Sequence, residues 1–421
     1  MGQKKFAYRS LAVATLLALS TGGAQASGFS VPEISIAGTA MSNALVANHE
    51  LLGAIPYNPS LAAFHSGTTV SGGINVVHAE SEVTPAIGTS NNFQGMDNVF
   101  IPMVQVTHQL NDAVTLGFGT SVPFGLSTKY PLGTFGILAA LDPGAPLSAG
   151  ALQPTESKVE IIDIAPTVAF KIGDNTAVAI GADVYWLREV IFDTQDIQNE
   201  GDGTGYGWNA SISHVAGPWS FGASYHSRSE IDIEGTTTVP LLGGSPASAT
   251  FIVPWRAQIG VRYQVNKQLA VEADISRTGW NSFQALNINN GHPGSLGTIS
   301  SVNNWDDANA YRLSGSYDLS EQTQLRFGYT RDMTGQGDDF FSARTADSDR
   351  HLFSIGLGHD LGDGLQIEAS YMLVKFDDRT LATTVPFGTY GSDPNGTSAY
   401  NGTYETTVHL LGVGLSKRFD L

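Results

Sequence analysis

The chain ends in the stretch YETTVHLLGVGLSKRFDL, residues 404–421, in which apolar side chains alternate with small or polar ones. Side chains in a β-strand point to opposite faces with period 2, so this stretch predicts a strand with one apolar and one polar face. The apolar face carries Leu411, Val413, Leu415, Phe419 and Leu421. A last strand that ends on an apolar residue is typical of bacterial outer-membrane β-barrels.

The start of the chain has the three parts of a secretory signal peptide. Lys4, Lys5 and Arg9 form a positive region, residues 11–19 form a short apolar core, and residues 24–26 (AQA) form a small-residue cleavage site. The apolar core is too short for a membrane helix, which needs ~20 residues. We therefore predict that residues 1–26 are a signal peptide and exclude them from the fold.

Composition excludes several classes of protein. The formal net charge is −18, and removal of Lys4, Lys5 and Arg9 with the signal peptide leaves −21, which argues against a nucleic-acid partner. There is no cysteine, so disulfides and thiolate metal sites are impossible. After the signal peptide no stretch approaches the ~18 consecutive apolar residues of a transmembrane helix.

Strand-like segments fill the chain after residue 66. We count about fourteen, an even number as a closed antiparallel barrel requires. They lie near residues 68–78, 99–109, 113–126, 157–171, 176–193, 205–214, 217–235, 250–263, 268–286, 306–318, 322–332, 348–361, 364–378 and 404–419. The predicted fold class is all-β, a transmembrane antiparallel barrel (67–421) whose lumen holds an N-terminal, mainly helical hatch (27–66).

The connections between these segments alternate in length. Short turns such as residues 173–175 and 362–364 alternate with longer segments such as 131–156, 287–305 and 379–403. Short periplasmic turns and long extracellular loops are the barrel pattern. Aromatic residues near strand ends, where amphipathic rings prefer the membrane interface, are Tyr130, Trp186, Trp280, Tyr317 and Tyr371.

Several motifs, in order along the mature chain, resemble the FadL-type outer-membrane transporters of hydrophobic compounds. They include Ser27-Gly28-Phe29, Asn58-Pro59-Ser60 where that family has Asn-Pro-Ala, Pro123-Phe124-Gly125-Leu126-Ser127-Thr128-Lys129-Tyr130, Gly205-Tyr206-Gly207-Trp208-Asn209-Ala210, Asp307-Ala308-Asn309-Ala310-Tyr311-Arg312 and Asp347-Ser348-Asp349-Arg350. Each motif is weak alone, and together they are specific.

The resemblance implies a fourteen-stranded barrel that captures its ligand at extracellular loops, passes it to an apolar lumen pocket and releases it through a gap in the wall. It implies that Gly28 and Phe29 lie in the inner pocket and that Asn58 and Pro59 face the wall opening. Ser60 departs from the family's alanine. The residues implied to form the kinked third strand at the opening are Pro123, Phe124 and Gly125.

Charged residues on the lumen faces are the remaining candidates for ligand contact. Four arginines, Arg256, Arg262, Arg312 and Arg326, share these faces with Glu272, Asp274 and Glu368. Buried charges are tolerated when paired, so these are either structural pairs or ligand contacts. Arg188, near an extracellular strand end, is a further candidate partner for a carboxylate. Asp338-Asp339 and Asp347-Ser348-Asp349 allow a loop cation site, with a solvated loop as the alternative.

These observations predict a passive transporter in the bacterial outer membrane, a monomer in contact with membrane lipid, that takes up long-chain fatty acids. Alternatives are an aromatic-hydrocarbon transporter of the same family, a water-filled porin, a lipid-acting barrel enzyme, and a phage or adhesin receptor. No H-E-x-x-H, G-x-S-x-G or P-loop motif occurs and the histidines show no metal-ligand spacing, so we predict no enzyme activity, cofactor or metal.

Overall fold

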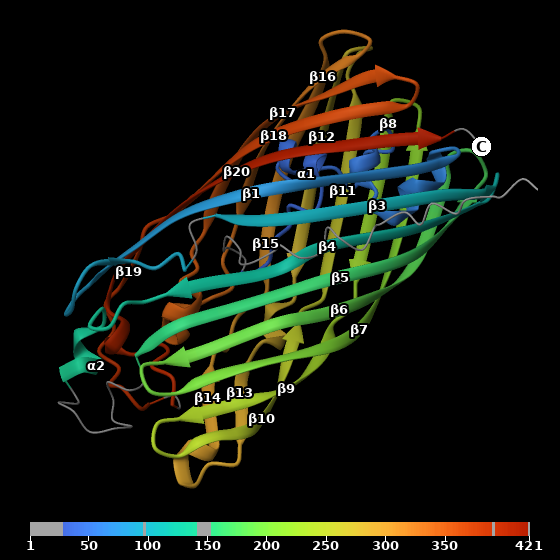
Figure 1. Ribbon diagram of the computed structural model, residues 1–421. Helices are drawn as coiled ribbons and strands as arrows, with labels where there is room; N and C mark the ends of the chain where they lie inside the picture. Colours follow the sequence, from blue (N-terminus) through green and yellow to red (C-terminus); the bar gives the residue numbers. More distant parts are fainter. Residues whose placement is uncertain (1–27, 96–97, 141–152, 390–391, 420–421) are drawn as a thin grey trace, which may run out of the picture.

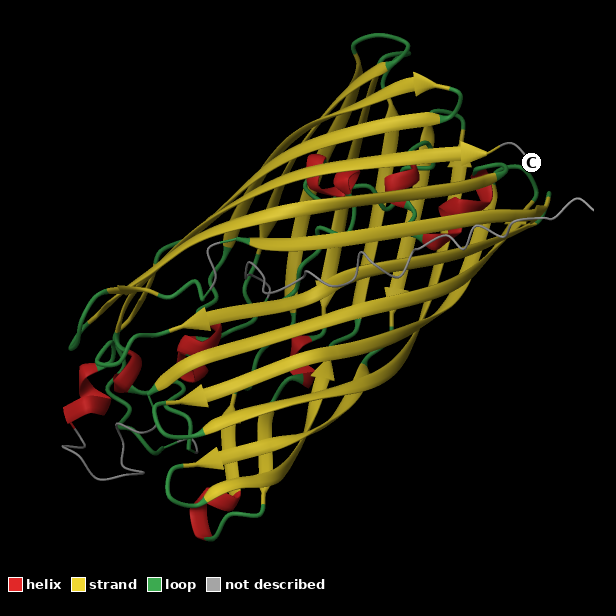
Figure 2. Cartoon of the chain, in the orientation of Figure 1, coloured by secondary structure: helices red, strands yellow, loops and turns green. Residues whose placement is uncertain are grey.

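A computed structural model describes residues 28–95, 98–140, 153–389 and 392–419, and these form a closed antiparallel β-barrel (Figures 1 and 2). The predicted signal peptide and the terminal Leu421 lie outside the described residues. Its strands are β1 (Thr68–Pro85), β2 (Asn91–Asn92), β3 (Val99–Asn111), β4 (Val114–Lys129), β5 (Pro154–Ile172), β6 (Thr176–Thr194), β7 (Gln198–Ala216), β8 (Trp219–His226), β9 (Ser229–Val239), β10 (Gly243–Val253), β11 (Arg256–Gln264), β12 (Leu269–Thr278), β13 (Ala285–Asn290), β14 (Thr298–Val302), β15 (Ala308–Asp318), β16 (Thr323–Asp332), β17 (Arg350–Gly362), β18 (Leu365–Phe376), β19 (Arg379–Leu381) and β20 (Gly402–Phe419).

Four of the wall strands are each interrupted, and each appears as two consecutive elements. They are β8 with β9, β10 with β11, β12 with β13, and β14 with β15, while β2 and β19 are short additions at the loop end. Pro254 stands at one of these breaks, because proline has no N–H to give to a strand ladder. The fourteen-stranded prediction is therefore confirmed for the described part of the chain. The last strand, β20, pairs with β1 and closes the ring.

The alternation in β20 places its apolar residues on the outer surface. Leu411, Val413 and Leu415 are 61%, 60% and 57% exposed, which suits contact with lipid. The prediction of one continuous alternation from Val253 to Tyr263 is wrong, since Ile259 faces outward while Val253 is fully buried in the lumen. The break at Pro254–Trp255 changes which face the alternate residues occupy. Trp280 and Tyr130, predicted at the membrane interface, are also buried.

Helices are few and short in the described chain. They are α1 (Ile36–Ala40), η2 (Leu52–Ala54), η3 (Pro59–Phe64), α2 (Gly136–Ala140), η5 (Trp280–Ser282), η6 (Gly294–Gly297), η7 (Asp338–Phe340), η8 (Ala343–Thr345) and η9 (Ser398–Tyr400). None of the helices described here has the length and apolar character needed to cross a bilayer.

Residues 28–66 lie against the inward faces of strands around the barrel (Figure 1). Helix α1 contacts β16, β17, β18 and β20, while η3 contacts β4, β5, β6 and β7. Glycines in the wall permit this approach, because a side chain at Gly222 would collide with the Val46 carbonyl and one at Gly328 with the Met41 backbone. Only α1, η2 and η3 are helical in this segment, so turns predominate rather than helix.

The long connections lie at the opposite end of the barrel from the short turns (Figure 2). Strands β5, β6 and β7 each have 19 residues, and about 9–11 suffice to cross a bilayer. Two loops, 333–349 and the described residues of 382–401 (382–389 and 392–401), pack together at this end with an apolar cluster that includes Phe341 and Tyr400. Arg344 ties them, with its Nε 3.2 Å from Asp393 Oδ1 and its guanidinium 3.7 Å from the centre of the Phe192 ring.

Candidate functional site: an aromatic cluster beside a gap in the barrel wall

The pairing between β3 and β4 stops part of the way along the wall. The ladder runs from Asn111↔Val114 to Val104↔Thr120, and no described residue of β3 pairs with β4 beyond that point. On its other edge β4 continues to pair with β5, with a register shift between Ser121 and Phe124. Pro123 lies inside this shift, where it removes a backbone donor and so weakens the ladder.

The N-terminal segment takes the place that β3 leaves. Ser30 forms an isolated antiparallel bridge with Phe124. Val31 N donates to Pro123 O at 2.8 Å, and Gly125 N donates to Phe29 O at 2.9 Å. The three residues of the expected kinked strand therefore lie together beside Phe29.

Phe29 is the centre of an aromatic cluster in the lumen. The centroid of its ring lies 4.7 Å from that of Trp280, 5.4 Å from Phe251, 5.5 Å from Phe283, and 6.0 Å from both Phe124 and Trp305. Phe29 is only 2% exposed. A ligand that enters this cluster therefore has to displace the Phe29 ring. The indole Nε1 atoms of Trp280 and Trp305 are buried and find no acceptor in the described chain.

A buried aspartate holds the backbone just before Phe29. Gly28 N donates to Asp347 Oδ2 at 3.0 Å. Gly28 has φ +68, and a side chain there would collide with Trp280 and Trp305, so glycine is required for this close approach. Burial raises the pKa of Asp347, in the loop before β17, to about 6. We call this contact the Gly28–Asp347 latch.

The Asn58-Pro59-Ser60 turn attaches the N-terminal segment to β7. Asn58 Nδ2 donates to Val46 O at 2.7 Å and to Ile212 O at 3.1 Å. Asn58 is the N-cap of η3, since its Oδ1 accepts a hydrogen bond from Ser60 N at 3.2 Å. Pro59 is the first residue of this helix. Ser60 Oγ hydrogen-bonds Ser213 Oγ at 2.8 Å, so the hydroxyl that distinguishes it from alanine is satisfied.

Two of the four predicted lumen arginines form ion pairs, and the other two do not. Arg262 forms an ion pair with Glu50 at 2.5 Å, and Arg326 pairs with Glu368. Arg256 and Arg312 make no ion pair within 4.0 Å with any described residue. The Nε atoms of both lack a hydrogen-bond partner in the described chain.

Arg256 and Arg312 line one cavity of about 70 Å³ between the N-terminal segment and the wall. The cavity borders the aromatic cluster, since Ser30 follows Phe29 and the Arg256 guanidinium lies 5.1 Å from the centre of the Phe124 ring. Gln258, Ser276 and Tyr57 also line it. These donors suit an anionic group more than a hydrocarbon.

Two other predicted sites have partners within the chain. Arg188 Nη1 lies 3.3 Å from Glu160 Oε1, so its charge is already paired. Among the acidic residues of the 333–349 loop, Asp338 forms an ion pair with Arg379 at 2.7 Å and Asp349 forms one with Arg331 at 2.8 Å.

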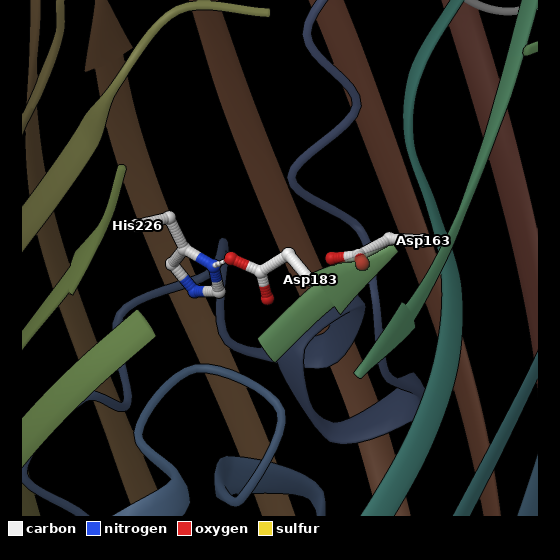
Figure 3. Close-up of side chains that lie close together, drawn as sticks. All are labelled: Asp163, Asp183 and His226. Carbon is white, nitrogen blue, oxygen red and sulfur yellow. Dashed lines mark hydrogen bonds and ion pairs between the residues drawn. The ribbon is translucent and has the colours of Figure 1, made fainter. Parts of the chain in front are cut away.

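One cluster was not predicted from the sequence. Asp163 of β5, Asp183 of β6 and His226 of β8 bring their side chains together on the lumen side (Figure 3). Their positions lie far apart along the chain, so no motif spacing marks them. The alternation of their strands is the sequence signal available, and it places each residue on the lumen face without saying which ones meet.

The chain matches the family "Outer membrane protein transport protein (OMPP1/FadL/TodX)" over residues 17–419. It is 24% identical to outer membrane protein P1 of Haemophilus influenzae, with 99% of this chain and 100% of that protein covered. It is 23% identical to a long-chain fatty acid transport protein of Escherichia coli O6:H1, with 93% and 97% covered.

Solved structures agree on the fold. A FadL homologue from Pseudomonas aeruginosa matches with a TM-score of 0.78 at 17% identity, over 93% of this chain and all of that one. The toluene transporter TbuX of Ralstonia pickettii matches with a TM-score of 0.67 at 17% identity, over 91% and 98%.

Fold and family together define the class as an outer-membrane β-barrel transporter of hydrophobic compounds, and not an enzyme. This chain belongs to the OMPP1/FadL/TodX family.

Proposed function

We propose that the chain takes up long-chain fatty acids, ahead of aromatic hydrocarbons, and releases them laterally through the gap beside β4. The observation that carries this proposal is the placement of Phe29, which fills an aromatic cluster while its backbone occupies the free edge of β4. One movement of the N-terminal segment would open both the pocket and the gap.

The unpaired donors favour a fatty acid over a hydrocarbon. Buried donors without acceptors cost free energy, and a ligand that pairs with them recovers it. Arg256 and Arg312, each with an unpartnered Nε, line the 70 Å³ cavity, and Trp280 and Trp305, each with an unpartnered Nε1, belong to the adjoining aromatic cluster. A carboxylate accepts from each of them and toluene from none, while the alkyl chain gains ~0.8 kcal/mol per buried CH₂.

An apolar groove nearer the loop end is our candidate for first capture. It has a volume of about 30 Å³ and is lined mainly by apolar groups of β6, β7, β9, β10 and β13, among them Phe192, Ile233, Leu286 and Ile288. From there the route leads to the Phe29 cluster, to which Ile233 also belongs. We propose residues 27–66 as the hatch, and the barrel acts as a monomer that delivers its ligand into membrane lipid.

The second candidate ligand is a neutral aromatic hydrocarbon, which the five aromatic side chains around Phe29 would accommodate by edge-to-face contact. A water-filled porin is less well supported, because residues 28–66 contact the inner wall on many sides. A planar-bilayer recording with a steady open channel would favour the porin.

The test is competition for the detergent-purified barrel, read by tryptophan fluorescence, between a long-chain fatty acid, its methyl ester and toluene. We expect displacement by the fatty acid and weaker displacement by the ester, which lacks the charge. Displacement by toluene alone would show that the arginines have a structural role.

A further inference from the structure

Three side chains beside the proposed carboxylate cavity form a compact group of metal-ligating type, and one of them, His226, also lines that cavity. The ligand atoms of Asp163, Asp183 and His226 all lie within 4.8 Å of one another. Asp183 Oδ2 and His226 Nδ1 are 3.0 Å apart, and the carboxylate of Asp163 points toward that of Asp183 (Figure 3). The three residues come from β5, β6 and β8.

One of these carboxylates lacks a partner although it is buried. Asp163 is 4% exposed, and its Oδ1 has no hydrogen bond in the described chain. The hydroxyl of Tyr185, which is fully buried, interacts with Arg256 and with both aspartates. Two buried carboxylates that face each other need positive charge close by.

Arg256 is the resident cation of this region, but it leaves the aspartates' oxygens free. It interacts with Asp163 and Asp183 over longer range and makes no ion pair with either within 4.0 Å. Asp183 uses Oδ1 for Asn209 Nδ2 at 2.6 Å. The groups that face the cluster are thus Arg256, Tyr185 and Asn209, and none of them hydrogen-bonds Asp163.

We propose that Asp163, Asp183 and His226 bind a divalent cation of the Zn²⁺ or Mn²⁺ type. Two carboxylate oxygens and one imidazole nitrogen are ligands that such ions accept, with water in the remaining positions. The 3.0 Å between Asp183 and His226 equals the spacing of a hydrogen bond and also suits two adjacent ligands of one ion, whose bonds are roughly 2.0–2.2 Å long. A cavity of about 40 Å³ lined by Asp163 and His226 has room for water ligands.

The site lies at the edge of the wall gap. Asp163 pairs with Ser121, the last β4 residue before the register shift, and the same cavity is bordered by Thr120, Ser121 and Pro59. A cation there ties β5 to β6 and β8 beside the opening. It also neutralises the two carboxylates next to Arg256, which leaves the arginine's charge to the neighbouring cavity. This second consequence rests on the proposed function, in which that cavity receives the fatty-acid carboxylate.

The test of the site uses Mn²⁺ alone, without any transported ligand. The intact barrel in detergent is stripped with a chelator and titrated with Mn²⁺, with free ion measured by electron paramagnetic resonance and Zn²⁺ added as competitor. We expect one Mn²⁺ per barrel, displaced by Zn²⁺. Loss of a supporting partner typically weakens a metal site 10–100-fold, so loss of a ligand should weaken it by at least about tenfold.

Variants test whether Mn²⁺ binds at this cluster or elsewhere on the barrel. Asp163→Asn removes an unpaired buried charge, so it should fold at least as well as the parent and still lose Mn²⁺ binding. Arg256→Met should tighten Mn²⁺ binding, because it removes a repelling charge. Asp174→Asn, in the exposed β5–β6 turn, is the matched control and should bind as the parent does. Absence of stoichiometric Mn²⁺ or Zn²⁺ binding, or equal binding by Asp163→Asn, would overturn the proposal and indicate a shared proton or buried water instead.

The proposed effect of the cation on ligand binding is tested separately, by measuring fatty-acid affinity with and without Mn²⁺. We expect fatty-acid affinity to rise several-fold when Mn²⁺ is present. Bound Mn²⁺ with unchanged fatty-acid affinity would overturn the link and leave the site. A barrel that binds Mn²⁺ and no fatty acid would contradict the proposed function while the metal proposal stands.

Discussion

Two pairs of neighbouring strands in the barrel wall differ in how completely they pair, and each contact between two such strands is called a seam here. Strands β1 and β20, from the two ends of the barrel sequence, pair from Thr68↔Phe419 to Pro85↔Gly402 without a register shift. Strands β3 and β4 are consecutive and joined by a short turn, yet their ladder stops at Val104↔Thr120. Proximity along the chain therefore does not decide how completely two strands pair.

Glycine content does not separate the two seams, but proline and a competing segment do. Gly73 and Gly414 face each other at the continuous β1–β20 seam, and Gly117 and Gly119 lie on β4 in the paired stretch next to the gap. The gap has Pro102 on β3 and Pro123 on β4, neither of which has an N–H to give. The backbone of residues 29–31 then supplies the hydrogen bonds that β3 does not.

Obstruction of the gap should have the largest effect on transport. We expect Gly125→Arg to place a bulky charge where Gly125 meets Phe29 and to reduce fatty-acid uptake by cells at least about tenfold, since ~1.4 kcal/mol on the limiting barrier is enough. The barrel should still insert and show its heat-modifiable migration.

The matched control for that variant is Gly337→Arg, which adds the same side chain at an exposed loop position with no atom nearby. Normal uptake by correctly inserted Gly125→Arg would mean that the gap is not the exit.

Removal of Arg256, whose Nε has no partner in the described chain, should affect binding of the anionic ligand specifically. A hydrogen bond to a charged group contributes about 1.5–3 kcal/mol, so Arg256→Met should weaken fatty-acid binding about 10- to 100-fold. Toluene binding should be unchanged. Arg228→Met, at an exposed ion pair with Glu230, serves as the control in the same fluorescence titration. Equal losses for fatty acid and toluene would point to a structural role for Arg256.

The Gly28–Asp347 latch predicts a dependence on pH. The pKa of Asp347 is raised to about 6 when it is buried in the latch, and it should return toward 3.8 when the latch opens to water. Burial outweighs the Gly28 hydrogen bond, which by itself lowers the pKa of Asp347, so the closed state binds the proton more tightly than the open state. Closure is therefore most favourable at low pH and weakens as pH rises through about 6.

Ligand binding, which requires Phe29 to move, should therefore improve about tenfold between pH 5 and pH 7. Asp347→Asn stays neutral and should remove this dependence while it keeps the weak, low-pH affinity. A titration series whose pH profile is the same in the parent and in Asp347→Asn would rule the latch out as its cause.

The smallest effect is expected away from the gap, where the N-terminal segment meets β7. Ser60→Ala removes the hydrogen bond to Ser213 and should cost about 1 kcal/mol in the free energy of unfolding. Urea unfolding of the detergent-solubilised barrel measures this, with Ser66→Ala at an exposed position as the control. A loss of uptake without a loss of stability would instead assign Ser60 to the transport route.

The local sequence pattern was sufficient to predict the strands. It was insufficient to predict which side chains of different strands contact one another. Alternation identified fourteen segments and the outward face of β20, because period 2 is written in consecutive residues. It failed at Val253 and Trp280, where a break in the strand turns the side chain inward. It also grouped four arginines of which the fold gives ion pairs to Arg262 and Arg326 alone.

The sequence by itself determined the class of the molecule, an exported β-barrel whose wall has an apolar outer face. This is because bilayer and strand geometry act on each segment separately. Only the tertiary structure brought Phe29 to Phe124, Gly28 to Asp347, and Asp163 to Asp183 and His226. Those meetings depend on strand register and on the path of residues 28–66 through the lumen, and both are settled by contacts between residues far apart in the chain.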